Sequence, residues 1–306
     1  MSDSGRRSIR AGSRTTLLAP ASPRTRASRL ARTTRATPGA PPTRTVHLPR
    51  GTAAALATAL AAALAGCASG GGEPDASRGT PTSTLTVYAA ASLTEAFEEL
   101  ATRFEAEHPS IDVAPIVADG SSILARQIIE GARADVLATA DEVTMASVDD
   151  EGLLASEPRI FAENVAVLAA PAGDPAGVGG LAGLTQPGVR LVVCAPDVPC
   201  GSAAHELFEA AGLRVTAASE EQNVTGVLTK LTLGEADAGV IYGSDLVRAD
   251  GAVEQLDTSA VPDVVSAYPI APLAGATDPG AADAFVTFVL SPAGQQVLAE
   301  FGFAAP

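Results

Sequence analysis

The chain has 306 residues and a formal net charge of −15, with 20 lysines and arginines against 35 aspartates and glutamates. Residues 1–66 hold 11 arginines and one acidic residue, so residues 67–306 retain 9 basic and 34 acidic residues and a formal charge of −25. This acidic balance excludes nucleic-acid binding through a basic surface. The length of the acidic part allows one large domain or two lobes of about 120 residues each.

Residues 1–66 have the pattern of a lipoprotein signal sequence. An apolar run, Ala53 to Ala65, follows the arginine-rich stretch and is shorter than the ~20 apolar residues that a membrane-spanning helix needs. A basic segment, a short apolar segment and small residues are the parts of a secretory signal. Cys67 directly follows the small residues, so we expect residues 1–66 to be removed and Cys67 to be lipidated as a membrane anchor. The alternative is an alanine-rich helix of the folded domain.

After a tether at residues 67–83, which are rich in Gly, Ser and Pro, the sequence predicts alternating strands and helices. Ser92 and Glu95 have the spacing of a capping box, with Ser92 as the N-cap of a helix that ends at His108, before a proline. The other expected helices are 122–131, 142–150, 201–211, 224–233, 281–290 and 292–301. The expected strands are 85–90, 111–117, 135–140, 164–170, 189–194, 238–242 and 264–273. This alternation predicts an α/β fold with parallel sheets and helical crossovers.

Two cysteines, Cys194 and Cys200, follow Cys67 and are separated by five residues that include proline. Outside the cell, paired cysteines are usually oxidised, and this spacing allows a disulfide where the chain turns. Free thiols and half of a metal site are the alternatives. A metal site is disfavoured because His205 is the one histidine nearby and there is no second cysteine pair.

Small polar residues and glycines stand at four strand-to-helix junctions. In open α/β sheets, ligands bind beyond the carboxyl ends of the strands, where helix N-termini offer free N–H groups and a positive dipole end. The hydroxyls of Ser92 and Ser121 would add donors to such an anion site. Each junction alone is also consistent with a simple helix cap or turn, so the prediction depends on their co-occurrence. The junctions are residues 90–92, 119–122, 199–202 and 222–225.

Signals of catalysis are weak. The sequence has no Gly-x-Ser-x-Gly, no Walker A and no dinucleotide-binding glycine motif. Cys200 and His205 are separated by more than a helical turn, which does not suit a nucleophile–base pair. His108 stands at a predicted helix end. We therefore expect a protein that is not an enzyme.

At these residues the chain resembles the periplasmic molybdate-binding proteins of ABC importers, over about residues 84–306. The resemblance rests on VYAAASLTEAF at 87–97, GSSILARQ at 120–127, ADVLATAD at 134–141, VPCG at 198–201, NV at 223–224, GVIYGSD at 239–245 and the closing SPAGQQ and FGF segments. It implies a two-lobed type II binding protein, in which each lobe is a mostly parallel sheet flanked by helices and the oxyanion lies in the cleft. Lobe 1 would comprise residues 84–163 and 270–306, and lobe 2 residues 164–269.

Carried over position by position, the resemblance implies a set of neutral donors with no direct metal ligand and no cofactor. Ser92 and Ser121 would donate from lobe 1 through hydroxyl and backbone N–H groups. From lobe 2 would come the backbone N–H groups of Cys200 and Val224 and the hydroxyl of Tyr242. Asp119 is a departure, because a carboxylate in the cleft would repel a dianion or accept a proton from hydrogen phosphate; we expect it to point outward.

The function that the resemblance implies is capture without chemistry. The protein would be an extracytoplasmic, lipid-anchored monomer that binds molybdate, and tungstate as well, and delivers the ion to an ABC permease by closing its lobes. The nearest alternative is a binding protein for sulfate or phosphate. More distant ones are a cysteine-dependent enzyme on a similar fold, which needs a free Cys200, and a lipoprotein sensor that docks on a signalling partner.

Overall fold

The computed structural model describes residues 82–306. The predicted signal segment, the lipidation site Cys67 and the predicted tether as far as residue 81 lie outside the described residues. The last residue of the predicted tether, Ser83, is already ordered in a strand, since β1 (Ser83–Leu85) pairs in parallel with β3 (Ile111–Val113).

The other strands are β2 (Val87–Ala90), β4 (Val117–Asp119), β5 (Val136–Ala138), β6 (Arg159–Pro171), β7 (Leu191–Cys194), β8 (Ser219–Glu221), β9 (Ala238–Tyr242), β10 (Val253–Gln255) and β11 (Val264–Pro272). The α-helices are α1 (Thr94–Glu107), α2 (Ser121–Ile129), α3 (Glu142–Asp149), α4 (Pro199–Ala210), α5 (Val224–Thr232), α6 (Gly243–Arg248), α7 (Pro279–Val289) and α8 (Pro292–Glu300). Two 3₁₀ helices are η1 (Ala91–Leu93) and η2 (Leu181–Thr185). No helix among residues 82–306 is both long and apolar enough to cross a membrane.

Most predicted elements are present, and the differences follow from local sequence. The strand expected at 111–117 is divided into β3, which pairs with β1 in a two-stranded sheet, and β4, which pairs with β2 in the larger sheet. β8 was not predicted, since its three residues, Ser-Glu-Glu, show no apolar alternation. α6 and β10 are too short to give a periodic signal.

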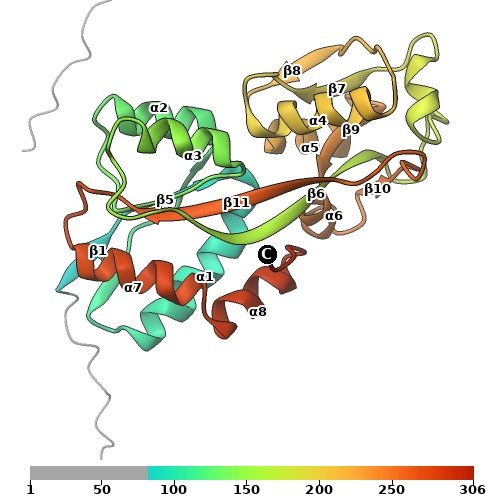
Figure 1. The fold of residues 1–306 in the computed structure, drawn as a ribbon. Helices are drawn as coiled ribbons and strands as arrows, with labels where there is room; N and C mark the ends of the chain where they lie inside the picture. The colour runs from blue at the N-terminus through green and yellow to red at the C-terminus, as the bar shows by residue number, and fades with distance from the viewer. Residues whose placement is uncertain (1–81) are drawn as a thin grey trace, which may run out of the picture. The chain divides into compact units, whose positions relative to one another are not determined.

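The larger sheet has nine strands in the order β4-β2-β5-β11-β6-β9-β7-β8, with β10 beside β6. At one end β2 pairs in parallel with β4 and β5, and at the other end β7 pairs in parallel with β8 and β9. The long strands β6 and β11 run antiparallel to each other in the middle and join the two parallel groups (Figure 1). The α/β fold class is therefore as expected. The sequence did not indicate that the two sheets are hydrogen-bonded into one.

Three hydrophobic cores lie on this sheet. One is formed by residues between 166 and 264. Each of the other two combines residues from two segments, 85–162 and 268–303. We call the part around the first core the second lobe, and the part around the other two the first lobe. The exact lobe boundaries remain a prediction, because β6 and β11 belong to both.

Helices begin directly beyond the carboxyl ends of four parallel strands. In the first lobe β2 leads into η1 and α1, and β4 leads into α2. In the second lobe β7 leads into α4 and β8 into α5. In Figure 1, α2 and α3 cover one face of the first-lobe sheet, while α1, α7 and α8 lie on the other. This arrangement directs four helix starts toward the space between the lobes.

Candidate functional site

The five residues predicted to bind an anion line one small pocket of about 20 Å³. A cavity of this size has no room for a sugar or an amino acid, because pockets for drug-sized ligands measure roughly 300–1,000 Å³. None of its lining residues carries a charged side chain. They are Ala91, Ser92, Gly120, Ser121, Ala140, Val198, Pro199, Cys200, Gln222, Asn223, Val224 and Tyr242.

Ser121 is placed in the pocket by the start of α2. It is buried, and its Oγ accepts a hydrogen bond from the backbone N–H of Ala140 at 3.0 Å. Because that bond uses a lone pair, the Ser121 hydroxyl retains its proton for donation. The residue before it, Gly120, occupies the N-cap position and provides no side-chain cap. The first N–H groups of α2 thus have no partner within the helix or from a capping side chain.

Ser92 does not cap a helix, so the predicted capping box with Glu95 is wrong. The 3₁₀ turn η1 begins one residue earlier, which places Ser92 inside the turn and leaves Leu93 at the N-cap of α1. The Ser92 Oγ instead lies 3.0 Å from the hydroxyl of Tyr268. The carboxylate of Glu95 turns toward Arg248 of the second lobe, 3.9 Å from its Nε.

The second lobe contributes two helix N-termini. Cys200 lies in the first turn of α4 and Val224 is the first residue of α5. No side chain caps α4, whereas the Asn223 side chain accepts from the N–H of Gly226 at the start of α5. The leading N–H groups of both helices carry the positive end of the helix dipole toward the pocket. Their position suits an anion.

Tyr242, at the end of β9, supplies a hydroxyl without a partner. Its side chain is only 2% exposed, and its Oη has no hydrogen bond to any described residue. Burial raises the pKa of this phenol well above its usual range. The nearby hydroxyls of Ser266 and Tyr268 oppose this rise in the pKa, but neither has hydrogen-bond geometry to the Tyr242 hydroxyl. An unpaired buried hydroxyl is costly, so it marks a place where a ligand oxygen would be bound.

A disulfide joins Cys194, at the end of β7, to Cys200, with the two Cα atoms 5.6 Å apart. It connects the strand end to the helix turn whose N–H group lines the pocket. The cysteine-enzyme alternative requires a free thiol at Cys200, and this bond removes it. His205 is largely exposed, 3.7 Å from the Glu209 carboxylate. Among residues 82–306, no group of three or more His, Cys, Asp or Glu side chains is placed to hold a metal ion.

The two lobes meet beside the pocket. Asp119 Oδ1 accepts from the backbone N–H of Gly120 at 2.7 Å and from Asn223 Nδ2 across the cleft at 2.8 Å. The Ser122 hydroxyl donates to the backbone oxygen of Asp197 at 3.0 Å. Asp119 is not among the lining residues, because its carboxylate is held at the rim by these donors.

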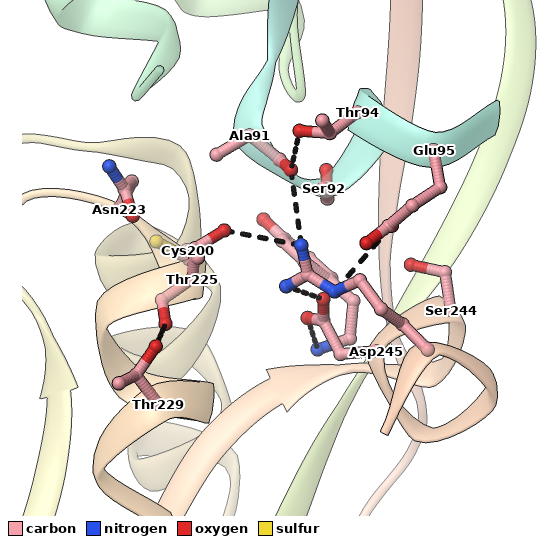
Figure 2. A network of polar contacts seen from close by, with 12 residues as sticks. Ala91, Ser92, Thr94, Glu95, Cys200, Asn223, Thr225, Thr229, Ser244 and Asp245 are labelled. Carbon is pink, nitrogen blue, oxygen red and sulfur yellow. Dashed lines mark hydrogen bonds and ion pairs between the residues drawn. The ribbon is translucent and has the colours of Figure 1, made fainter. Parts of the chain in front are cut away.

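On another side of the pocket, Arg248 at the end of α6 connects the lobes through Ala91, Thr225 and Asp245. Figure 2 labels these three partners. It donates to the backbone oxygen of Ala91 in the first lobe at 3.4 Å and to the hydroxyl of Thr225 at 3.2 Å. It also pairs with buried Asp245 at 2.7 Å, which accepts from the backbone N–H of Tyr242. Burial raises the pKa of Asp245 to about 6, although Arg248 opposes the rise.

Sequence reasoning missed three polar residues around the pocket. They are Arg248, Asn164 on β6 and Tyr268 on β11. Asn164 and Tyr268 are buried in strands whose residues are mostly apolar. That placement is the signal by which they could have been found, since a buried polar side chain requires a partner.

The chain belongs to the family of bacterial extracellular solute-binding proteins, whose family model matches residues 85–304. It is 42% identical over 250 residues to the molybdate-binding protein ModA of Mycobacterium tuberculosis, covering 81% of this chain and 95% of the relative. Identity to ModA of Escherichia coli is 31% over 229 residues, covering 72% and 88%.

Similarity extends to a sulfate-binding protein of Synechococcus elongatus, at 27% identity over 284 residues, covering 82% of this chain and 81% of that protein. Among solved structures, the periplasmic molybdate-binding protein of Azotobacter vinelandii superposes with a TM-score of 0.61 at 19% identity. The superposition covers 72% of this chain and 99% of the Azotobacter protein. This structural likeness concerns the fold, and it confirms the two-lobed α/β class.

Proposed function

We propose that this protein binds molybdate, and tungstate as well, in the pocket between its lobes. The observation that carries the proposal is the donor set. Two serine hydroxyls, the unpaired hydroxyl of Tyr242 and the first N–H groups of three helices surround one small pocket without charged side chains. Such a set binds an oxygen-rich anion through hydrogen bonds alone, and no step of catalysis is required.

The donors also favour anions that carry no proton. Molybdate, tungstate and sulfate present only acceptor oxygens at neutral pH, whereas hydrogen phosphate needs an acceptor for its proton. The carboxylate of Asp119, which precedes the lining residue Gly120, is already engaged by Gly120 and Asn223 at the rim. The size of the closed pocket then selects among unprotonated ions, because donors set for a larger ion stay too far from a smaller one.

The 42% identical mycobacterial relative, named as molybdate-binding, supports molybdate over other ions. Sulfate is the second candidate, because a 27% identical relative is named as sulfate-binding. Molybdate and sulfate are both unprotonated tetrahedral dianions, so the same pocket residues would bind either ion.

In the cell the protein would act as an extracytoplasmic lipoprotein, anchored through Cys67, that delivers its ion to an ABC permease. We take residues 84–163 with 270–306 as lobe 1 and residues 164–269 as lobe 2, which close on the ion and dock as a monomer. β6 and β11 provide the connection on which such a hinge motion would turn. Mass spectrometry of the N-terminal peptide tests the anchor, and an unmodified cysteine or an uncleaved leader would contradict it.

The binding proposal is tested by equilibrium dialysis of the purified protein against molybdate, with retained molybdenum measured by mass spectrometry. We expect one ion for each chain. Ser121→Ala, which removes a donor from the first lobe, should lower the retained amount at limiting molybdate. Retention that is equal for wild type and Ser121→Ala would place the ion elsewhere on the protein.

A further inference from the structure

The hydroxyl of Ser92 stands at the end of a buried hydrogen-bond chain. Its Oγ is 3.0 Å from Oη of Tyr268, and that Oη is 3.4 Å from Nδ2 of Asn164. Asn164 lies on β6 and Tyr268 on β11, and both side chains are almost completely buried. The chain therefore connects the two strands shared by the lobes to the wall of the pocket.

Backbone N–H groups set the direction of this chain. Oδ1 of Asn164 accepts from the N–H of Val165 at 3.1 Å and from the N–H of Ser244 at 3.3 Å. A backbone N–H can only donate, so the amide oxygen faces these groups. Nδ2 therefore donates, to Oγ of Ser244 at 2.8 Å and to Oη of Tyr268 at 3.4 Å. An amide nitrogen cannot accept a hydrogen bond. The Tyr268 oxygen therefore accepts from Asn164, and its own proton must be donated elsewhere.

Ser92 is the acceptor that remains for that proton. Once Asn164 is set aside, the group among residues 82–306 that has hydrogen-bond geometry to the Tyr268 hydroxyl is Oγ of Ser92. The hydroxyl of Tyr242, although its ring packs edge-on against Tyr268, does not. With a lone pair of Ser92 occupied by Tyr268, the serine proton has no acceptor among the described residues. It is left to face the pocket that Ser92 lines.

We propose that Asn164 and Tyr268 are positioning residues that hold the Ser92 hydroxyl as a donor, so that the site accepts unprotonated oxyanions and rejects protonated ones. The inference rests on the proposed anion binding. A serine that rotates freely could present a lone pair to the proton of hydrogen phosphate. A serine fixed as a donor cannot, and the buried phosphate proton would stay unpaired, which is unfavourable.

Two near-isosteric variants test this arrangement. Tyr268→Phe removes the hydroxyl that orients Ser92. Asn164→Asp keeps an acceptor for the two backbone N–H groups but presents an oxygen to Tyr268. Tyr268 would then donate to that oxygen, Ser92 would donate to Tyr268, and a lone pair of Ser92 would face the pocket. The matched control is Tyr88→Phe, which alters a mostly buried tyrosine of the first lobe that does not line the pocket.

The readout is the ratio of the affinities for molybdate and hydrogen phosphate, measured by calorimetric titration and competition. Mildly alkaline buffer is used, so that both ions are dianions and only phosphate carries a proton. The added charge of Asn164→Asp weakens both ions alike and cancels in the ratio. A purely structural disturbance would also weaken both ions alike.

We expect Tyr268→Phe to lower molybdate affinity by no more than about tenfold, the change typical of one hydrogen bond to a charged group, because Ser92 keeps its hydroxyl but loses its fixed direction; phosphate affinity should not fall. In Asn164→Asp the ratio of molybdate affinity to phosphate affinity should fall below that of Tyr268→Phe, by a factor of the same order. Tyr88→Phe should have the wild-type ratio. The inference is overturned if wild type binds molybdate and both variants keep its ratio. If Asn164→Asp fails to fold by circular dichroism, Tyr268→Phe decides alone. A wild type that binds neither ion overturns the proposed function itself, which is a different result.

Discussion

At the scale of single residues, the hydroxyl of Tyr242 shows most directly that the pocket is made for a ligand. Folding normally pairs buried polar groups, and here a phenol at 2% exposure has no partner among the described residues. Ser121 differs from Tyr242, because its Oγ accepts a hydrogen bond from the backbone N–H of Ala140 while its hydroxyl proton has no acceptor within residues 82–306. Both residues therefore have donor capacity that only a bound acceptor would use.

Tyr242→Phe separates binding from stability. The variant should lose about tenfold in molybdate affinity, since one hydrogen bond to an anion is removed. The free energy of unfolding without ligand should stay equal or rise, because an unpaired buried hydroxyl disappears. Titration calorimetry and urea denaturation measure the two quantities. A large loss of stability without ligand would show that the hydroxyl has a structural partner.

Asp245 gives a pH dependence. Burial raises its pKa to about 6 in the folded protein, above the value of about 4 of an unfolded aspartate. The folded state then binds more protons in that interval, so this residue makes stability fall as pH rises from about 4 to about 6. In Asp245→Asn the free energy of unfolding should lack this component between the two pH values. The free energy of unfolding is measured by urea denaturation at a series of pH values. Equal slopes of this free energy against pH in wild type and variant would refute the prediction.

At the scale of elements, the site consists of helix starts held by strand ends. The sequence reveals these junctions because small polar residues interrupt apolar runs, as in residues 119–122. It does not reveal how each helix begins. At η1, one extra 3₁₀ turn places Ser92 inside the turn and not at the expected N-cap, and its Oγ lies beside the Tyr268 hydroxyl.

The disulfide between Cys194 and Cys200 fixes one of these junctions. Replacement of both cysteines by serine should destabilise the protein by about 2 kcal/mol, as expected for closure of a short loop. It should also weaken molybdate binding, because the N–H group of residue 200 loses its fixed position. Thermal unfolding with and without molybdate measures both effects. Unchanged molybdate affinity in the double variant would show that α4 alone holds the donor.

At the scale of the whole molecule, the two lobes form one continuous sheet and touch around the pocket. Repeated strand and helix patterns predicted the α/β class, and the family resemblance predicted which five residues meet. The buried hydrogen-bond chain from Asn164 through Tyr268 to Ser92 could not be predicted, because Tyr268 lies 176 residues from Ser92 in sequence. Such contacts depend on the register of β6 against β11, which local patterns do not specify.

Gly120→Ala tests closure of the lobes. A Cβ at Gly120 would lie 2.5 Å from the backbone oxygen of Gln222 in the other lobe, while its backbone angles suit alanine. We expect weaker molybdate binding with no loss of stability in the ligand-free protein, because only the closed arrangement is obstructed. Gly275→Ala, where a Cβ meets nothing within 4 Å, is the matched control. Equal affinities in both variants would argue against closure at this contact.

Calorimetric titration of the purified protein with molybdate, tungstate, sulfate and hydrogen phosphate is the decisive experiment. A pocket of neutral donors closed around an unprotonated dianion should bind molybdate and tungstate tightly, one ion for each chain, with sulfate weaker and hydrogen phosphate weakest. Binding of phosphate together with silence toward molybdate would contradict this and would indicate Asp119 as a proton acceptor in the cleft.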